Sequence, residues 1–344
     1  MKRTQKVVLA LVMTCTVFLF TLGNRNLPHA NYTTEAKAEC VMELHSGRIL
    51  YEKSGEEKLP MASTTKIVTA IAVLEKEKDI RDRFPVPAEA VGIEGSSVYL
   101  KDGEEYSTEE LLYALMLRSG NDAAVALAVH SFGSVAACSV AMNQIAQKAG
   151  ALNSQFLTPH GLPQEGHYTT ARDLTLITCY GLKNPDFAKI VSTTYYQPKG
   201  WKNKNKMLYN YDGAIGVKTG YTKEAGRCLV SAATRGNMTL VCTLLNCSDT
   251  YGRTTTLLND AFSSYENVKI HATETPVELQ IGGKKYATHT KKDLYYPILE
   301  VEREYIVKKV EVLKIKKPKK GDLVGKIKIY LSNRLLFSEN LYKL

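Results

Sequence analysis

A serine and a lysine three residues apart, Ser63 and Lys66 in the stretch LPMASTTK, could supply a nucleophile and its base. Residues at i and i+3 share one face of a helix, with about 5–6 Å between their Cβ atoms. A lysine can take the proton of a serine hydroxyl only when the lysine is neutral. The positive end of a helix and a second nearby cation would both lower the pKa of this lysine. Alone, the pair equally fits a helix-capping serine beside a surface lysine, because both residue types are common.

Two further motifs follow in an order that favours the catalytic interpretation. Ser119-Gly120-Asn121 is expected in a turn between two helices, and Lys218-Thr219-Gly220 is expected at the end of a strand. A second Ser-x-Asn match, at Ser338, lies outside the interval between the other two motifs. Ser-x-x-Lys, Ser-x-Asn and Lys-Thr-Gly in this order are typical of penicillin-binding proteins and class A β-lactamases. The sequence therefore predicts a serine acyl-transfer site assembled from three distant segments.

The elements that must position these motifs follow from hydrophobic periodicity and turn residues. Residues 41–51 are typical of a hairpin, and residues 63–78 have apolar side chains at helical spacing after Pro60. The sequence Ser-Thr-Glu-Glu at 107–110 has the form of a capping box. Further helices are expected at 107–117, 122–132, 134–148 and 254–265, and from Ala171 and Pro185, with short strands at 213–218, 227–234 and 239–246. This order predicts a sheet covered by helices, with an all-helical lobe inserted.

The N-terminal residues are typical of a secretory signal. Lys2, Arg3 and Lys6 precede an apolar run at 7–22, which is shorter than the roughly 20 apolar residues of a spanning helix. We expect the signal peptide at 1–38, cut after Ala30 or Ala38, with an uncleaved anchor as the alternative.

Two domains are expected after the signal. The motifs lie in a catalytic domain at 39–266, and alternating strands with glycine turns indicate a separate β-rich domain at 267–344. The net charge of +10 is concentrated in the second domain, where residues 268–344 contain 17 Lys and Arg against 9 Asp and Glu. For an exported chain, this favours peripheral contact with anionic wall polymer or with the membrane surface over nucleic acid, although a solvated lysine-rich strand surface explains it equally.

Cysteine and histidine spacing predicts neither a metal site nor a cofactor. Cys15 belongs to the signal, and the other six cysteines lie mostly in apolar patterns, so we expect buried free thiols, although export permits disulfides. The sequence has no Cys-x-x-Cys, His-Glu-x-x-His or Gly-x-Ser-x-Gly stretch. His160 and His167 are therefore expected to order a polar loop.

Beyond its motifs, the chain resembles the low-molecular-mass penicillin-binding proteins, which are exported serine-type D-alanyl-D-alanine carboxypeptidases. The likeness covers residues 40–265 almost continuously, through SGRILYEK, LPMASTTKIVTA, LMLRSGNDAA, TPHGLPQEGHYTTARDL and NKNKMLYNYDGAIGVKTGYTKEAG. It implies the α/β (α+β) fold of transpeptidases and β-lactamases, an antiparallel sheet flanked by helices with an inserted all-helical lobe. The β-rich domain fits the small C-terminal module of these enzymes.

The resemblance also implies a role for each matched residue. Ser63 would attack the terminal D-Ala-D-Ala bond of a peptidoglycan stem pentapeptide, Lys66 would take its proton, and Ser119 would relay a proton to the departing D-alanine. The substrate-binding residues would be Asn121, Lys218, Thr219, Gly220 and Arg253. The oxyanion hole would be formed by the backbone N–H groups of Ser63 and Tyr221, and such donors contribute about 3 kcal/mol each.

Within this set, Asn121 would hold the substrate amide and Lys66, while Lys218 and Thr219 would favour the terminal carboxylate. An arginine can grip a carboxylate at two points, which suits Arg253, although an exposed arginine at a helix start is the alternative. β-Lactams would act as covalent inhibitors. The implied location is the outer face of the cytoplasmic membrane or the cell wall.

Three other functions share this sequence pattern. A β-lactamase would need a deacylating glutamate, and Glu165 lies nearest by position but in a Gln-Glu-Gly turn without the Glu-x-x-x-Asn pattern of class A enzymes. An idle penicillin-sensing or wall-binding module would keep the cleft without turnover. An endopeptidase that cuts peptide cross-links would use the same groups.

Overall fold

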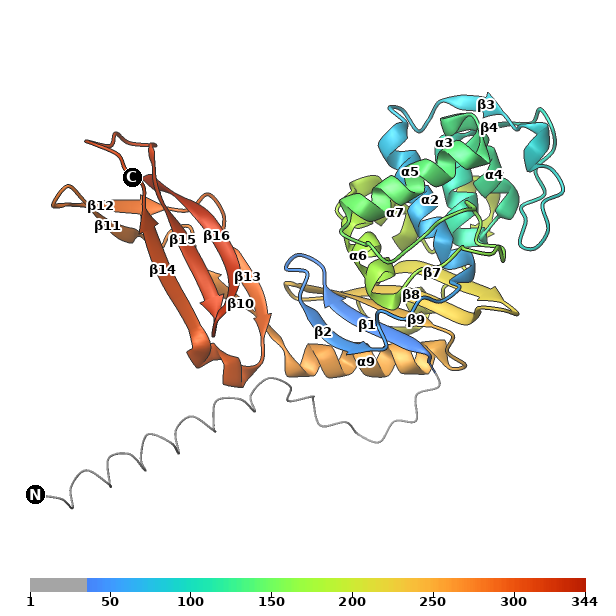
Figure 1. Cartoon of the computed structure of the whole chain (residues 1–344). Helices are drawn as coiled ribbons and strands as arrows, with labels where there is room; N and C mark the ends of the chain where they lie inside the picture. The colour runs from blue at the N-terminus through green and yellow to red at the C-terminus, as the bar shows by residue number, and fades with distance from the viewer. Residues whose placement is uncertain (1–35) are drawn as a thin grey trace, which may run out of the picture. The chain divides into compact units, whose positions relative to one another are not determined.

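The predicted hairpin and the three predicted strands form one antiparallel sheet in the computed structural model, which describes residues 36–344 (Figure 1). The strand order is β2-β1-β9-β8-β7. The bounds are β1 (Ala38–Glu43), β2 (Ile49–Lys53), β7 (Ala214–Thr222), β8 (Gly226–Arg235) and β9 (Met238–Leu245). Strand β7 is therefore an edge strand, with one hydrogen-bonding side left for another chain.

The sheet has an apolar core on each face, because successive side chains of a strand point to opposite faces. In β1, Cys40 and Met42 belong to the larger core, and Val41 belongs to the smaller one. Helix α9 (Thr250–Ser264) covers the smaller core, while α6 (Ala171–Gly181) and α7 (Pro185–Ser192) pack on the other face (Figure 1). The buried apolar residues of α2 (Lys66–Lys76) also belong to the larger core.

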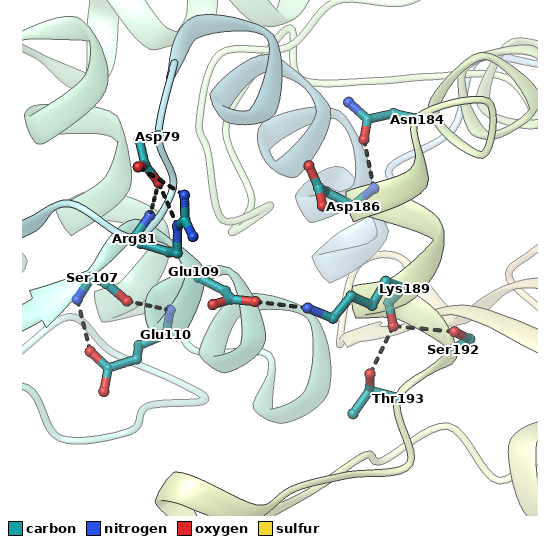
Figure 2. Close-up of polar contacts among 10 residues, drawn as sticks. All are labelled: Asp79, Arg81, Ser107, Glu109, Glu110, Asn184, Asp186, Lys189, Ser192 and Thr193. Carbon is teal, nitrogen blue, oxygen red and sulfur yellow. Dashed lines mark hydrogen bonds and ion pairs between the residues drawn. The ribbon is translucent and has the colours of Figure 1, made fainter.

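The predicted capping box is present in the helical lobe. Ser107 caps α3 (Thr108–Tyr113): its Oγ accepts from the Glu110 N–H at 3.1 Å, and the Ser107 N–H donates to the Glu110 carboxylate at 2.8 Å (Figure 2). Instead of one helix to Leu117, the chain changes to a π-helical segment, η3 (Ala114–Arg118). Lys189 on α7 binds Glu109 on α3 at 3.1 Å (Figure 2).

The other elements complete the catalytic region. The remaining helices and turns are η1 (Ala62–Thr65), η2 (Ala88–Ala90), α4 (Asn121–Phe132), α5 (Val135–Lys148), η4 (Gln197–Lys199) and α8 (Met207–Asn210). The short strands are β3 (Arg83–Pro85), β4 (Glu105–Ser107), β5 (Tyr195–Tyr196) and β6 (Trp201–Lys202). Residues 91–104, between η2 and β4, contain no helix or strand.

The C-terminal residues form two further sheets around their own apolar core. The sheets pair β10 with β13, and β11-β12-β16-β15-β14 in that order. The bounds are β10 (Glu266–His271), β11 (Val277–Ile281), β12 (Lys284–His289), β13 (Leu294–Ile298), β14 (Ile306–Val312), β15 (Leu323–Leu331) and β16 (Arg334–Lys343), with a short turn η5 (Glu300–Tyr305).

All six cysteines of the described residues are buried and free, as predicted. Burial raises the pKa of the Cys138 thiol to about 12. Cys15, the apolar run at 7–22 and the cut after Ala30 lie outside the described residues. Within residues 36–344, no single helix is long and apolar enough to cross a membrane, and only α4 and α5 together, bent by 87°, pass that test of length and composition.

Candidate active site

The amine of Lys66 lies at the point where the predicted motifs meet. Ser63 is on η1, which runs directly into α2, whose first residue is Lys66. Lys66 Nζ lies 2.8 Å from Ser63 Oγ, 2.6 Å from Asn121 Oδ1 and 2.7 Å from the His160 carbonyl oxygen. A neutral amine has two N–H donors and one lone pair. Since the two carbonyl oxygens can only accept, the lone pair of a neutral Lys66 is left for the Ser63 hydroxyl.

The surroundings of Lys66 favour this neutral form. Its side chain is fully buried, and burial is the largest cause that lowers its pKa well below the ordinary lysine value. The positive charges of Lys218 and Lys204 lower the pKa further, and the carboxylate of Asp122 acts in the opposite direction. Desolvation and like charge both penalise the ammonium, so the structure supplies the condition that a lysine base requires.

Strand β7 brings the third motif against the turn that carries the nucleophile. A Cβ at Gly220 would lie 3.0 Å from the Met61 carbonyl oxygen and 3.1 Å from the backbone nitrogens of Ser63 and Thr64. Only glycine lets two backbones approach this closely without displacement. The neighbouring Tyr221, whose N–H is the second expected oxyanion donor, is 65% exposed.

Lys218 is a second buried lysine on the same strand. It is 1% exposed, and its Nζ donates to the Thr219 carbonyl at 2.9 Å. Burial, followed by the charge of Lys204, lowers its pKa to about 7. A carboxylate that binds beside it would raise this pKa and so favour the charged form of Lys218.

The second motif lies in the predicted turn. Ser119 ends η3 in the left-handed conformation, with φ 65° and ψ 33°, and is 6% exposed. Asn121 is the first residue of α4, and its amide joins Lys66 to the loop before β4: Oδ1 accepts from Lys66, and Nδ2 donates to the Glu94 carbonyl at 2.6 Å. Within residues 36–344, the Ser119 hydroxyl makes no hydrogen bond with Lys66 or Lys218.

The two histidines order a loop, as predicted. His167 Nδ1 accepts from the Leu157 N–H at 2.9 Å, so Nε2 carries the proton and donates to Thr65 Oγ1 at 3.0 Å. Burial lowers the pKa of His167 to about 4, which keeps the ring neutral. The loop also supplies the His160 carbonyl to Lys66. Sequence reasoning missed that contact, because a backbone carbonyl has no residue-type signal.

Arg253, which was expected to bind the substrate carboxylate, instead binds a buried glutamate in the structure. Its Nε and Nη2 donate to the Glu39 carboxylate at 2.9 and 2.7 Å, and Nη2 also donates to the Tyr51 hydroxyl at 3.0 Å. Glu39 is fully buried on β1, which is three strands from β7, roughly 14 Å at about 4.8 Å per strand. The side chain of Arg253 therefore neutralises a buried glutamate and makes no contact with the three motifs in the described structure.

Glu165 is also apart from the reacting groups. Its side chain is exposed, and it makes no hydrogen bond with Ser63 or Lys66 among residues 36–344. A deacylating glutamate would have to orient a water beside the acylated serine. The described structure gives Glu165 no such position.

Comparisons with known proteins agree with this geometry. The model of the peptidase S11 family, described as D-alanyl-D-alanine carboxypeptidase, matches residues 24–249. The chain is 35% identical over 269 residues to the D-alanyl-D-alanine carboxypeptidase DacF of Bacillus subtilis, covering 73% of this chain and 69% of that protein. Penicillin-binding protein 5 of Haemophilus influenzae superposes with a TM-score of 0.78 at 26% identity, covering 93% and 98% of the two chains. The Streptomyces K15 DD-transpeptidase superposes with a TM-score of 0.64 at 33% identity, covering 67% and 98%.

Proposed function

Because the chain belongs to the peptidase S11 family of D-alanyl-D-alanine carboxypeptidases, we propose that it releases the terminal D-alanine of peptidoglycan stem peptides through an acyl-enzyme on Ser63. The observation that carries the proposal is the set of contacts of Lys66, whose amine lies within 2.8 Å of the Ser63 hydroxyl and the Asn121 amide oxygen. The chain is a serine-type hydrolase with the transpeptidase and β-lactamase-like fold.

The proposed reaction has two halves. Neutral Lys66 takes the Ser63 proton while Oγ attacks the carbonyl carbon of the D-Ala-D-Ala bond. The backbone N–H groups of Ser63 and Tyr221 bind the oxyanion, and such preorganised donors are effective because they need no reorganisation during the reaction. Lys66 then gives this proton to the departing D-alanine amine by way of the Ser119 hydroxyl, which has to reach Lys66 in the substrate complex, because the two make no hydrogen bond in the described structure. Water then attacks the ester, which regenerates the Ser63 hydroxyl and frees the shortened peptide.

Substrate binding follows from the edge strand and the two buried lysines. An extended peptide can pair with the free side of β7. Its terminal carboxylate would lie beside Lys218 and Thr219, and the second N–H of the Asn121 amide would hold the substrate amide carbonyl. β-Lactams, which penicillin-binding proteins bind, would acylate Ser63 and stay, since Glu165 is exposed and makes no hydrogen bond with Ser63 or Lys66 in the described structure.

Two assays on one preparation test this function. Incubation with diacetyl-Lys-D-Ala-D-Ala should release D-alanine, and intact mass spectrometry after penicillin treatment should find a stable adduct that is absent in Ser63→Ala. Adduct formation without D-alanine release would indicate a sensor. Rapid loss of the adduct would indicate a β-lactamase, and no adduct would refute the acyl-enzyme.

Gly220→Ala should slow acylation by fluorescent penicillin by about 10- to 100-fold, because a Cβ there pushes against the backbone of the nucleophile turn, and a small misplacement of reacting groups can cost that much. Gly236→Ala is the matched control at a left-handed turn with no atom within 4 Å of the added Cβ. It should lower stability by about 1 kcal/mol and leave the acylation of folded protein unchanged. Wild-type acylation rates in Gly220→Ala would contradict the close approach as a functional constraint.

The domain limits and location are proposed on the same basis. Lys37 and Ala38 pair with β9, where the Lys37 N–H donates to the Leu245 carbonyl at 3.1 Å, so a signal cut after Ala30 preserves β1 and a cut after Ala38 would remove part of it. We place the catalytic domain at about 39–266 and the β-rich domain at 267–344. The similarity to D-alanyl-D-alanine carboxypeptidases and to a penicillin-binding protein supports a location outside the cytoplasm. The basic β-rich domain would contact anionic wall polymer or the membrane surface there.

A further inference from the structure

The carboxylate of Asp122 accepts several hydrogen bonds from the loop at 94–100. Asp122 is the second residue of α4 and is 1% exposed. It accepts from the Ser97 hydroxyl at 2.5 Å, from the Val98 N–H at 3.0 Å and from the Leu100 N–H at 3.2 Å. A buried carboxylate with several donors is a strong and geometrically specific anchor. One side chain therefore fixes a segment that has no helix or strand of its own.

The same loop supplies two backbone carbonyl groups that accept hydrogen bonds from Asn121. The Glu94 carbonyl accepts from Asn121 Nδ2 at 2.6 Å, and the Ser96 carbonyl accepts from the Asn121 backbone N–H at 2.7 Å. Because Nδ2 is held by Glu94, the amide oxygen must face the other way, toward Lys66 Nζ at 2.6 Å. Gly95 lies between these two carbonyls, and a Cβ there would be 2.8 Å from Asn121 Nδ2. The loop thus selects which end of the amide meets the lysine.

We propose that Asp122 is a positioning residue of this enzyme, which fastens the loop at 94–100 so that the loop holds the Asn121 amide oxygen against Lys66. The inference deepens the proposed function and rests on the roles proposed there for Lys66 and Asn121. Asp122 does not touch the reacting atoms. It acts through Glu94 and Ser96, and without it the amide can rotate away from the lysine.

Asp122 also has an electrostatic consequence at Lys66. Its negative charge raises the pKa of Lys66, against burial and the positive charges of Lys218 on β7 and Lys204 before α8. Among residues 36–344, His160 is a further titratable neighbour, and burial, with the charge of Lys66, lowers its pKa to about 4, so it is uncharged at neutral pH. Removal of the carboxylate charge therefore lowers the pKa of Lys66 further and extends the neutral base to lower pH.

Asp122→Asn tests the proposal through the second-order rate of acylation by fluorescent penicillin as a function of pH. We expect the plateau rate to fall by about 10- to 100-fold, because the side-chain amide of Asn121 is less well held. The part of the profile in which the rate rises with pH, its acid limb, should move to lower pH. Ser97→Ala, which removes one of the three loop contacts, should lower the plateau less and leave the acid limb in place. Asp186→Asn is the matched control, since Asp186 is also the second residue of its helix but is exposed on α7 (Figure 2).

The outcomes separate this inference from the proposed function. If wild-type protein is acylated and releases D-alanine but Asp122→Asn keeps both the plateau and the acid limb, the inference is wrong and the function stands. If Asp122→Asn has a lower melting temperature but the folded variant is acylated with unchanged kinetics, Asp122 has a purely structural role, and the inference is also wrong. If Asp122→Asn does not fold, Ser97→Ala decides: an unchanged plateau refutes the proposal. Wild-type protein without acylation would refute the proposed function itself.

Discussion

Lys66→Arg is expected to reduce acylation by penicillin by about 10³-fold, because general-base assistance is lost while the positive charge is kept. A guanidinium stays protonated at any usable pH, so burial cannot convert it to a base as it does the lysine amine. Its N–H groups can still donate to the Asn121 and His160 oxygens that hold Lys66 now. The measurement is intact mass after fixed exposure to penicillin, with circular dichroism to show that the fold is retained.

Lys189→Arg is the matched control for this substitution. Lys189 is an exposed helical lysine that binds Glu109, and an arginine can keep that ion pair (Figure 2). It should be acylated at the wild-type rate. Normal acylation of Lys66→Arg would show that another group takes the Ser63 proton and would remove the basis of the proposed mechanism.

The wild-type pH profile follows from the same pKa. Because the pKa of Lys66 lies well below the ordinary lysine value, the fraction of neutral amine rises with pH through that lowered pKa and then reaches a plateau. The rate of acylation should therefore rise on the acid side and level off before the ordinary lysine range. A rate that kept rising to the ordinary lysine pKa would indicate an exposed, unperturbed Lys66.

The main elements of this site could be predicted from the sequence because their signals are local. The Ser63 to Lys66 spacing, the Ser107 capping box and the strand before Gly220 each depend on neighbouring residues. The largest cause of the lowered pKa of Lys66 could not be predicted in this way. The sequence suggested a helix end and a second cation, whereas complete burial by packed segments is the dominant cause in the structure.

Other parts of the structure lack a local signal altogether. The loop at 94–100 contacts Asn121 through backbone carbonyls, which have no residue-type signal. Strands β10, β13 and β16 have mixed or short apolar patterns, and their pairing in the sheets decides their conformation. Arg253 was expected at the substrate because of its position in the family pattern. Its actual partner, Glu39, lies 214 residues away in sequence.

Arg253→Met is expected to lower the free energy of unfolding by about 3–5 kcal/mol, because it leaves the fully buried carboxylate of Glu39 without its bidentate partner. The Arg253 side chain is itself only 11% exposed, so water cannot replace the lost contacts easily. Urea unfolding followed by circular dichroism measures the loss. Acylation of the folded fraction should keep its wild-type rate, since neither residue of the pair contacts Lys66 or Lys218.

The double variant with Glu39→Met and Arg253→Met separates the loss of the ion pair from the burial of a carboxylate that has lost its guanidinium. Replacing both partners of a buried pair by apolar side chains is often neutral, so the double variant should recover most of the stability that Arg253→Met loses. A loss of activity without a loss of stability in Arg253→Met would support the original expectation that Arg253 binds the substrate. If Arg253→Met keeps its stability but releases D-alanine from the peptide much more slowly, its guanidinium must leave Glu39 and bind the substrate carboxylate during turnover.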